Sequence, residues 1–501
     1  MRNFILKLTL RILFGFTLIG IMSQSACMVK NIPLENVVMF DKRGRLVDPT
    51  DNMLGLKIPG FRYSPIDDPS LYFEQVTTAL KNHPKDSNGK RKVLFYIHGG
   101  LNTQKSTLER ARDLSPKILK AGYYPVFVNW QSSLPSSYLS HLLWVRQGRD
   151  WDWWLSPLGP FYLGADIARG VVRAPMVSLA QIYNDMLTFP FLKPYYNEIC
   201  TAKALEKEYR EEGGSGNTSN PALAISFGPD QRTNGEFVDS LGTYILTLPF
   251  KWVLTPVALD TFGTNSWEMM NRNARMLFYT EDEFFRGTPR TDQSGGLYRF
   301  MKALKDTVDE NPEEWEITLV GHSMGTIVMN EIIRSFSLNF ENIVYMAGAT
   351  SVRDYQDTIF PYLKAHPQTQ VYHLVLHPLA EIRDRWGDKY LWIDPPMRGS
   401  LLVWIDQFLS RPETSLDKTV GRFSNLMRAV HTTPGLSGNA QSTYDFRSQI
   451  HIKVFGVGKN MKDLAPQRHG DFNDFDFWEK DFWKPDQTSD DLSDYQCLSV
   501  Q

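Results

Sequence analysis

Residues 317–328 read ITLVGHSMGTIV and place Ser323 between Gly321 and Gly325. An apolar stretch precedes the pentapeptide GHSMG, 321–325, and a stretch with helical character follows it. Ser323 is therefore predicted to stand on a strand-to-helix turn. Such a turn holds the serine backbone under strain and points the first N–H groups of the helix toward the hydroxyl. The pattern favours a nucleophile over a serine that only caps a helix.

A serine hydroxyl needs a base at hydrogen-bond distance to attack near neutral pH. Among ten histidines, His469 lies in a polar, glycine-containing loop just past the last predicted strand, 449–458, and His431 precedes that strand. His469 is the favoured candidate, since its place resembles that of the general base in the α/β-hydrolase superfamily, and His431 is the rival. His451 lies inside the strand and is predicted to be packed.

A carboxylate is also needed to orient this histidine. The residues after the strand predicted over 370–378 offer Glu381, Asp384 and Asp388. Glu381 is preferred because it lies closest to the end of the strand, and Asp384 comes second. Asp354, in the loop after the preceding strand, is a more distant alternative.

The elements around these residues alternate between strand and helix, which predicts an α/β fold with a doubly wound, mostly parallel sheet. Compact apolar runs predict the strands, and apolar residues spaced three and four apart predict the helices. The predicted strands are 92–100, 123–130, 315–321, 341–348, 370–378 and 449–458, and the main helices are 103–122, 326–336, 351–366 and 401–409.

This order of elements, with GHSMG at 321–325 and HGGLN at 98–102, resembles the α/β-hydrolase superfamily, and most of all its bacterial and fungal serine esterases and lipases. The resemblance covers about 92–130 and 267–480. It implies hydrolysis of carboxylic esters through an acyl-enzyme, with lipid acyl chains among the substrates. It also implies an oxyanion hole made by the backbone N–H of Gly100 or Leu101 and that of Met324.

Two other functions fit the same residues. An acyltransferase would use the same triad and pass the acyl group to an alcohol or amine, and exclusion of water from the site would decide between the two. A binding or scaffold protein could keep the fold without turnover. The chain has neither a phosphate-binding loop nor the glycine fingerprint of dinucleotide binding, and no Cys/His spacing typical of zinc, so no cofactor or metal is expected.

The chain divides into five predicted parts. Residues 131–265 lack the regular alternation and are predicted to form a large insertion of helices and loops, a lid or cap. The parts are a leader (1–27), an N-terminal extension (28–91), the hydrolase core (92–130 and 266–485), the insertion (131–265) and a C-terminal tail (486–501).

The first 27 residues have the layout of a secretory signal, with cations ahead of a short apolar run and small residues after it. Cys27 follows Ser25 and Ala26, which resembles the lipobox of bacterial lipoproteins, although Gln24 stands where that motif usually has leucine. Lipid attachment at Cys27 and simple cleavage near Ser25 or Ala26 are both open. The protein is expected to be exported, as a periplasmic or envelope-anchored protein or as a secreted one.

Composition limits the partners. The formal net charge is −2 with both signs mixed along the chain, so nucleic-acid binding is not expected. Cys200 and Cys497 could form a disulfide or remain free thiols.

An aromatic-rich stretch could form a lid or acyl pocket, a surface that contacts lipid headgroups, or a small core of the insertion. Its members are Trp144, Trp151, Trp153, Trp154, Phe161 and Tyr162.

Overall fold

The computed structural model describes residues 29–50, 65–66, 68–146, 148–187, 224–227, 252, 254–289, 294–384, 399–431, 447–455 and 465–484. The chain forms two compact units. The first unit combines Met1–Pro84, Gly100–Ala165 and Asn265–Pro312. The second unit combines Lys85–Gly99, Asp166–Thr264 and Glu313–Gln501, and it contains the predicted nucleophile and base.

The second unit is built on a parallel sheet with the strand order β2-β7-β8-β9-β10-β6. Parallel register aligns the carboxyl ends of these strands, with Ile97 opposite Gly321 and Leu376 opposite Phe455. The loops after β7, β9 and β10 therefore leave the sheet at one edge. The strands are β2 (Arg91–Ile97), β7 (Trp315–His322), β8 (Phe340–Met346), β9 (Gln370–Leu376), β10 (Ile450–Phe455) and β6 (Ala224–Phe227).

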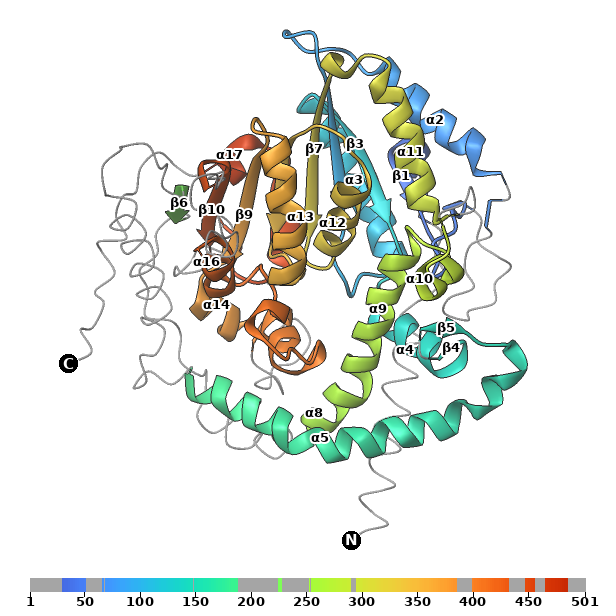
Figure 1. Ribbon diagram of the computed structural model, residues 1–501, viewed down its shortest axis with the longest axis vertical. Helices are drawn as coiled ribbons and strands as arrows, with labels where there is room; N and C mark the ends of the chain where they lie inside the picture. The colour runs from blue at the N-terminus through green and yellow to red at the C-terminus, as the bar shows by residue number, and fades with distance from the viewer. Residues whose placement is uncertain are drawn as a thin grey trace, which may run out of the picture. The chain divides into compact units, whose positions relative to one another are not determined.

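Helices cover both faces of this sheet (Figure 1). Successive side chains of a strand point to opposite faces. On β9, Tyr372 packs edge-on against Trp483 of α17 (Lys480–Trp483), with ring centroids 5.0 Å apart. The next residue, His373, places Nε2 2.9 Å from the hydroxyl of Tyr355 in α13 (Val352–Ala365). The two helices thus lie on opposite faces.

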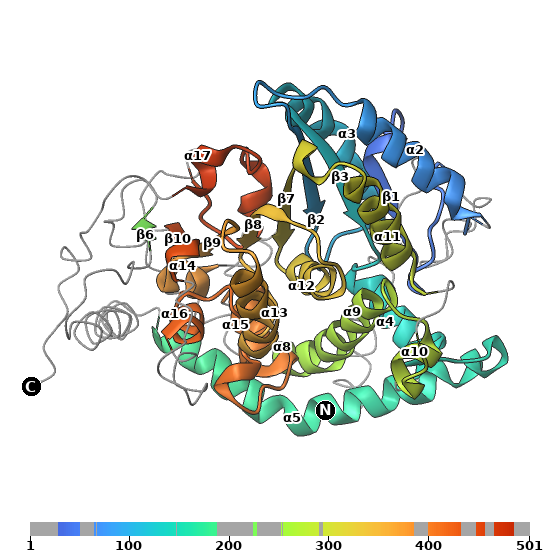
Figure 2. The ribbon, with the colours of Figure 1, turned by 45° about the horizontal axis from the view of Figure 1, so that its top comes forward.

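Helix α12 (Gly325–Ser335) follows β7 directly and packs on β7, β2 and α13 (Figure 2). Its inward face carries Val328, Met329 and Ile332, spaced for one side of a helix and all fully buried. This packing fixes the start of α12, and with it the turn that carries Ser323.

The first unit pairs β1 (Val37–Met39) with β3 (Tyr123–Asn129) in parallel register. The hydroxyl of Tyr72 in α2 donates to the carbonyl of Val37 at 2.6 Å and ties α2 to β1. Helix α3 packs on β3, α11 on α2 and α4 on α9. The helices are α2 (Pro69–Asn82), α3 (Gln104–Lys120), α4 (Leu134–Leu143), α9 (Asn265–Met276), α10 (Glu281–Arg286) and α11 (Gly296–Asp309).

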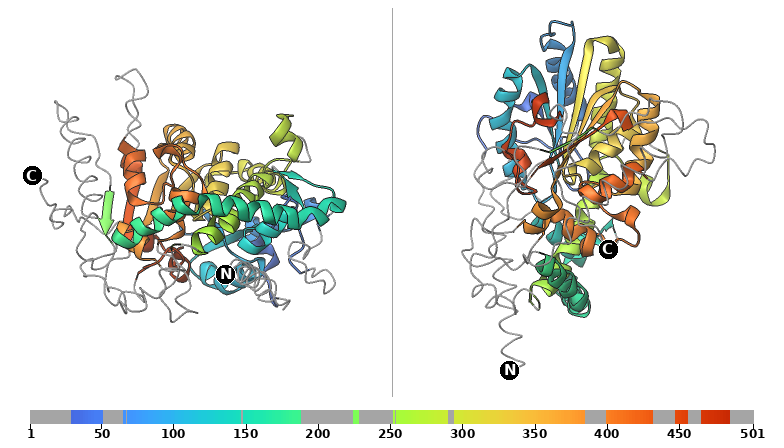
Figure 3. Two further views of the ribbon diagram at one scale, coloured as in Figure 1. Left: turned by 90° about the horizontal axis from the view of Figure 1, so that it is seen from below. Right: turned by 90° about the vertical axis from the view of Figure 1, so that its left-hand side faces the viewer.

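The predicted α/β architecture, a parallel sheet flanked by helices, is confirmed, and each strand predicted from the sequence is present within a few residues. The region predicted as an insertion, 131–265, is divided between the two units. Its residues 131–165 belong to the first unit and 166–264 to the second. It also contributes β6, which extends the sheet beside β10. Its main helix is α5 (Gly159–Leu187), drawn from two sides in Figure 3.

Candidate active site

Ser323 stands on a strained turn between β7 and α12. Its φ is +51°, in the left-handed region that residues with a side chain rarely adopt. The turn is held from both sides, because the N–H of Ser323 donates to the carbonyl of Met346 at 2.8 Å and its carbonyl accepts from the N–H of Ala349 at 3.0 Å. Backbone strain that the surroundings maintain in this way is common at functional sites.

Two glycines allow the main chain to pass close to Ser323. A Cβ on Gly325 would lie 2.2 Å from the carbonyl oxygen of Ile97, at the end of β2. A Cβ on Gly99 would lie 2.8 Å from the Cβ of Ser323. The main chain after β2 therefore passes directly beside the serine, and any side chain at residue 99 would displace one of the two.

His469 meets Ser323 across 146 residues of sequence, with Nε2 2.8 Å from Oγ. Both side chains are buried. Burial lowers the pKa of His469 well below 6.5, and the proximity of His322 lowers this pKa further. The imidazole is therefore neutral near pH 7, which is the form that can accept a proton from the serine hydroxyl.

The two predicted carboxylates occupy different environments. Asp384 follows α14 (Pro378–Arg383), and its Oδ2 accepts the backbone N–H of His469 at 3.0 Å. Glu381 lies one helical turn earlier and is fully buried, and its Oε2 accepts the hydroxyl of Ser400. Burial raises the pKa of Glu381 to about 8, so this carboxyl is neutral near pH 7.

The preference for Glu381 as the orienting carboxylate is therefore not supported by its contacts. Within the described residues, neither Glu381 Oε1 nor His469 Nδ1 has a hydrogen-bond partner. A neutral carboxyl also lacks the negative charge that would stabilise an imidazolium. Asp384, which already contacts the main chain of His469, is the better candidate. Asp388 lies outside the described residues.

Three residues that the sequence did not single out hold the His469 loop in place. The hydroxyl of Tyr96 donates to Asn473 Oδ1 at 2.5 Å, and Asn473 Nδ2 lies 3.2 Å from His322 Nδ1. His322 Nε2 lies 3.0 Å from the carbonyl oxygen of His469. Because a carbonyl only accepts, Nε2 of His322 carries the proton and Nδ1 accepts from the amide.

The sequence feature that could have pointed to this network is the position of His322 next to Ser323 in the GHSMG pentapeptide. Asn473 gave a weaker one, four residues after His469 in the same polar loop. Neither residue type is diagnostic alone, since a buried amide or imidazole more often satisfies the backbone than takes part in chemistry.

The backbone N–H groups predicted to form the oxyanion hole differ in the hydrogen bonds that they make. Met324 is the N-cap residue of α12, where backbone N–H groups have no partner within the helix. The N–H of Leu101 instead donates to the carbonyl of Ser132 at 2.7 Å, so that donor is already engaged. Gly100 and Leu101 both belong to the first unit, whereas Met324 shares the second unit with Ser323.

The other candidates have structural roles or lie outside the description. His451 bonds Gln370 at 2.7 Å and stacks on Tyr372, as a packed residue does. Asp354 accepts from Asn330 at 2.7 Å. His431 ends α16 (Phe423–His431), and its side chain is not among those described. The three cysteines, Cys27, Cys200 and Cys497, also lie outside the described residues.

Some side chains of the aromatic-rich stretch pack together, and others are exposed to solvent. Trp151 and Tyr162 meet edge-on at 5.4 Å, and the guanidinium of Arg146 lies over both rings. Trp151 and Tyr162 are half-buried in this cluster. Trp154 and Phe161 are instead 61% and 77% exposed.

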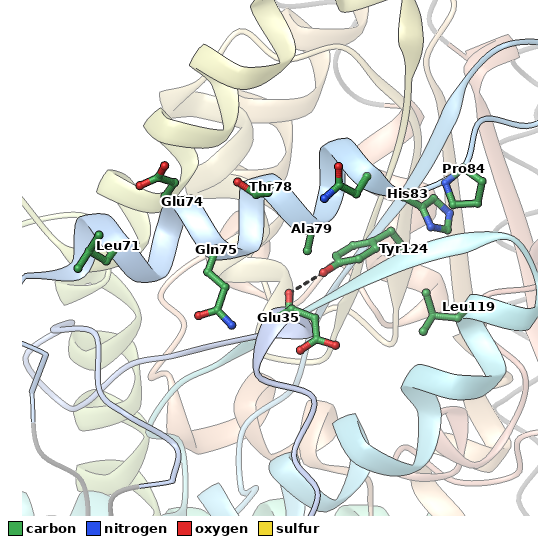
Figure 4. Close-up of a pocket in the computed structure, with 11 residues that line it drawn as sticks. Glu35, Leu71, Glu74, Gln75, Thr78, Ala79, His83, Pro84, Leu119 and Tyr124 are labelled. Carbon is green, nitrogen blue, oxygen red and sulfur yellow. Dashed lines mark hydrogen bonds between the residues drawn. The ribbon is translucent and has the colours of Figure 1, made fainter.

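A hollow of about 790 Å³ lies in the first unit, between α2, the end of α3 and the start of β3 (Figure 4). Glu35, Gln75 and Tyr124 are among its lining residues, and the Tyr124 hydroxyl is bonded to the Glu35 carbonyl at 2.8 Å. None of the predicted site residues lines it. Across the described residues, no cluster of side chains has the composition of a metal site.

Comparison of the chain with protein-family models, with curated proteins and with solved structures finds no match.

Proposed function

We propose that the protein is a serine hydrolase that cleaves carboxylic esters. The observation that carries this proposal is the 2.8 Å contact between Ser323 Oγ and Nε2 of His469. A serine on a strained turn and a neutral, buried imidazole are the two groups that nucleophilic acyl transfer requires.

In the proposed reaction, Ser323 Oγ attacks the ester carbonyl carbon and passes its proton to Nε2 of His469. The C–O bond to the alcohol then breaks, and His469 returns the proton to the departing alkoxide. A water molecule, deprotonated by the same imidazole, then attacks the acyl carbon. The bond between this carbon and Ser323 Oγ breaks, His469 returns the proton to Oγ, and the acid leaves. Each half-reaction leaves His469 neutral, and the second restores the Ser323 hydroxyl.

Two further groups assist the proposed reaction. The N–H of Met324, at the start of α12, stabilises the oxyanion of the tetrahedral intermediate together with the positive end of the helix. Asp384 stabilises the imidazolium. One carboxylate can accept both the backbone N–H and the Nδ1–H of the same histidine, and catalytic hydrogen bonds often tighten only once substrate is bound.

Turnover of p-nitrophenyl esters of increasing chain length tests the proposal. Wild type should hydrolyse at least one member of the series, and Ser323→Ala should reduce turnover to the background. Ser115→Ala is the matched control, because this buried serine bonds only within α3, to Ala111 at 2.6 Å. Equal loss in both variants, or equal activity in wild type and Ser323→Ala, would contradict the proposal.

We also propose that the protein acts outside the cytoplasm. The support is the layout of the first 27 residues, with Arg2, Lys7 and Arg11 ahead of an apolar run that ends near Cys27. Cell fractionation of wild type and Cys27→Ala tests this. Recovery of both with the cytosolic fraction would contradict export, and release of Cys27→Ala alone from the membrane fraction would identify a lipid anchor.

A further inference from the structure

Helix α5 has its polar and apolar faces reversed relative to a water-facing helix. From Phe161 to Tyr183, no exposed residue is charged, and the only exposed hydroxyl is that of Tyr183. Large apolar side chains dominate the face, with Val172 79% exposed and Leu179 67% exposed. A surface helix of a soluble protein normally presents charged residues to solvent and apolar residues to the core.

The charged residues of α5 point inward. Arg173 Nη1 lies 2.5 Å from Asp260 Oδ1, and Arg169 Nε lies 3.8 Å from Asp260 Oδ2. Asp260 is fully buried and Asp166 is 7% exposed. Burial of charged groups is costly unless they are paired. The inner face of α5 therefore carries ion pairs, while its exposed face carries apolar side chains.

The exposed face is long, continuous and bounded by aromatic residues. From Phe161 to Tyr183 it extends over roughly 33 Å at about 1.5 Å per residue. Phe161 and Tyr183, 77% and 58% exposed, stand at its two ends. Tyrosine combines an apolar ring with a polar hydroxyl, the character that favours the boundary between lipid and water.

The chemistry of this face favours lipid over protein as its partner. Protein interfaces surround an apolar centre with a polar rim, and helix pairs that form coiled coils carry charged residues beside the seam. Along α5 the exposed positions beside the large side chains are instead Gly164, Ala165, Ala168 and Pro175. A hydrocarbon phase requires no such rim.

We propose that α5 seats the protein on a phospholipid surface, with its axis along the membrane and the face from Phe161 to Tyr183 in the region between headgroups and acyl chains. In the part of the chain that the structure describes, no helix is long and apolar enough to cross a membrane. The inference is independent of the proposed catalytic function.

The charge distribution gives this proposal a specific signature. Arg169 and Arg173 face Asp260, and their side chains are only 35% and 20% exposed, so this face offers few cations to lipid phosphates. Binding through α5 should therefore depend mainly on apolar burial. It should be equal on zwitterionic and anionic vesicles and should persist at high salt, which screens exposed charges.

The test uses the full chain with its three cysteines replaced by serine and an environment-sensitive fluorophore attached at one new cysteine. Val172→Cys reports on α5, and Leu71→Cys on α2 is the matched control, because Leu71 is also exposed, at 71%. With phosphatidylcholine vesicles, emission from residue 172 should shift to the blue and gain roughly twofold as the probe leaves water. Emission from residue 71 should not change, so attachment through the N-terminal residues alone cannot imitate the result.

Three outcomes would overturn the proposal. The first is no change at residue 172 on any vesicle, and the second is a change that needs anionic lipid or is lost at high salt. The third is a shift at residue 172 in the absence of vesicles. A shift that grows with protein concentration would indicate that a second copy of the chain covers this face. A shift present at all concentrations would indicate that a segment of the same chain covers it. Loss of the shift in a Leu179→Glu variant that keeps its fold would support the proposal.

Discussion

The backbone N–H of His469 donates a hydrogen bond of 3.0 Å to Oδ2 of Asp384, although 85 residues separate the two. This contact ties the loop after β10 to the segment after β9. It also places a carboxylate beside the main chain of the residue whose imidazole contacts Ser323. The relative roles of Asp384 and Glu381 follow from it.

Asp384→Asn is expected to reduce kcat about a thousandfold, because the amide removes the charge that stabilises the imidazolium. Glu381→Gln should keep most of the activity, since the glutamate carboxyl is already neutral near pH 7. Steady-state kinetics of both purified variants measure this. A larger loss in Glu381→Gln than in Asp384→Asn would restore the preference that sequence position alone suggested.

Glu381 should also make stability depend on pH. Its pKa is raised from an ordinary 4.5 to about 8 in the folded protein, so the folded state holds a proton that the unfolded state releases. The stabilisation is complete below pH 4.5 and is lost as the pH rises toward 8. Urea unfolding at several pH values should show Glu381→Gln losing less stability than wild type over this interval, and parallel curves would contradict the assignment.

The acid limb of the pH–rate profile should reflect His469. Burial lowers the pKa of this imidazole well below 6.5, so the proton that blocks it is bound only in more acidic solution. The profile of kcat/KM is expected to fall with a midpoint well below pH 6.5. A midpoint at or above 6.5 would indicate an exposed or differently paired base.

Asn473 is expected to act as a positioning residue. Removal of its amide in Asn473→Ala breaks the link between Tyr96 and His322, and His322 then holds the His469 carbonyl less firmly. We expect kcat to fall about tenfold with little change in KM. Asn342→Ala is the control, a buried asparagine bonded to Thr318 within the sheet, which should cost stability but not kcat. Equal kcat in both variants would assign Asn473 a purely structural role.

Gly99→Ala should impair the site by crowding, because the added methyl would lie 2.8 Å from the Cβ of Ser323. We expect a loss of at least tenfold in kcat/KM, or a lower melting temperature if the backbone yields instead. Gly164→Ala is the matched control, since a Cβ at this position in α5 meets nothing within 4 Å. Unchanged activity and stability in Gly99→Ala would contradict the close approach.

The sequence predicted the parts of the site that depend on the order of elements. A strand, a turn with two glycines and a helix define the place of Ser323, and the last strand defines the loop of His469. The orienting carboxylate could not be chosen this way, because Glu381 and Asp384 differ by less than one helical turn. Their difference comes from Ser400 and from burial, which involve a segment that follows later in the chain.

Other features escaped prediction for related reasons. Strand β6 has four residues and is held by its pairing with β10 rather than by its own pattern. The reversed faces of α5 give the same helical period as ordinary faces, so periodicity alone does not show which side meets the protein. The link between Tyr96, Asn473 and His322 joins three elements that only tertiary structure brings together.

The central claim is that His469 activates Ser323, and labelling with a fluorophosphonate probe followed by peptide mass spectrometry tests it most directly. The probe should modify Ser323 in wild type and react at least a hundredfold more slowly in His469→Ala. Folded wild type that stays unlabelled, modification of another residue, or equally fast labelling of His469→Ala would contradict the claim.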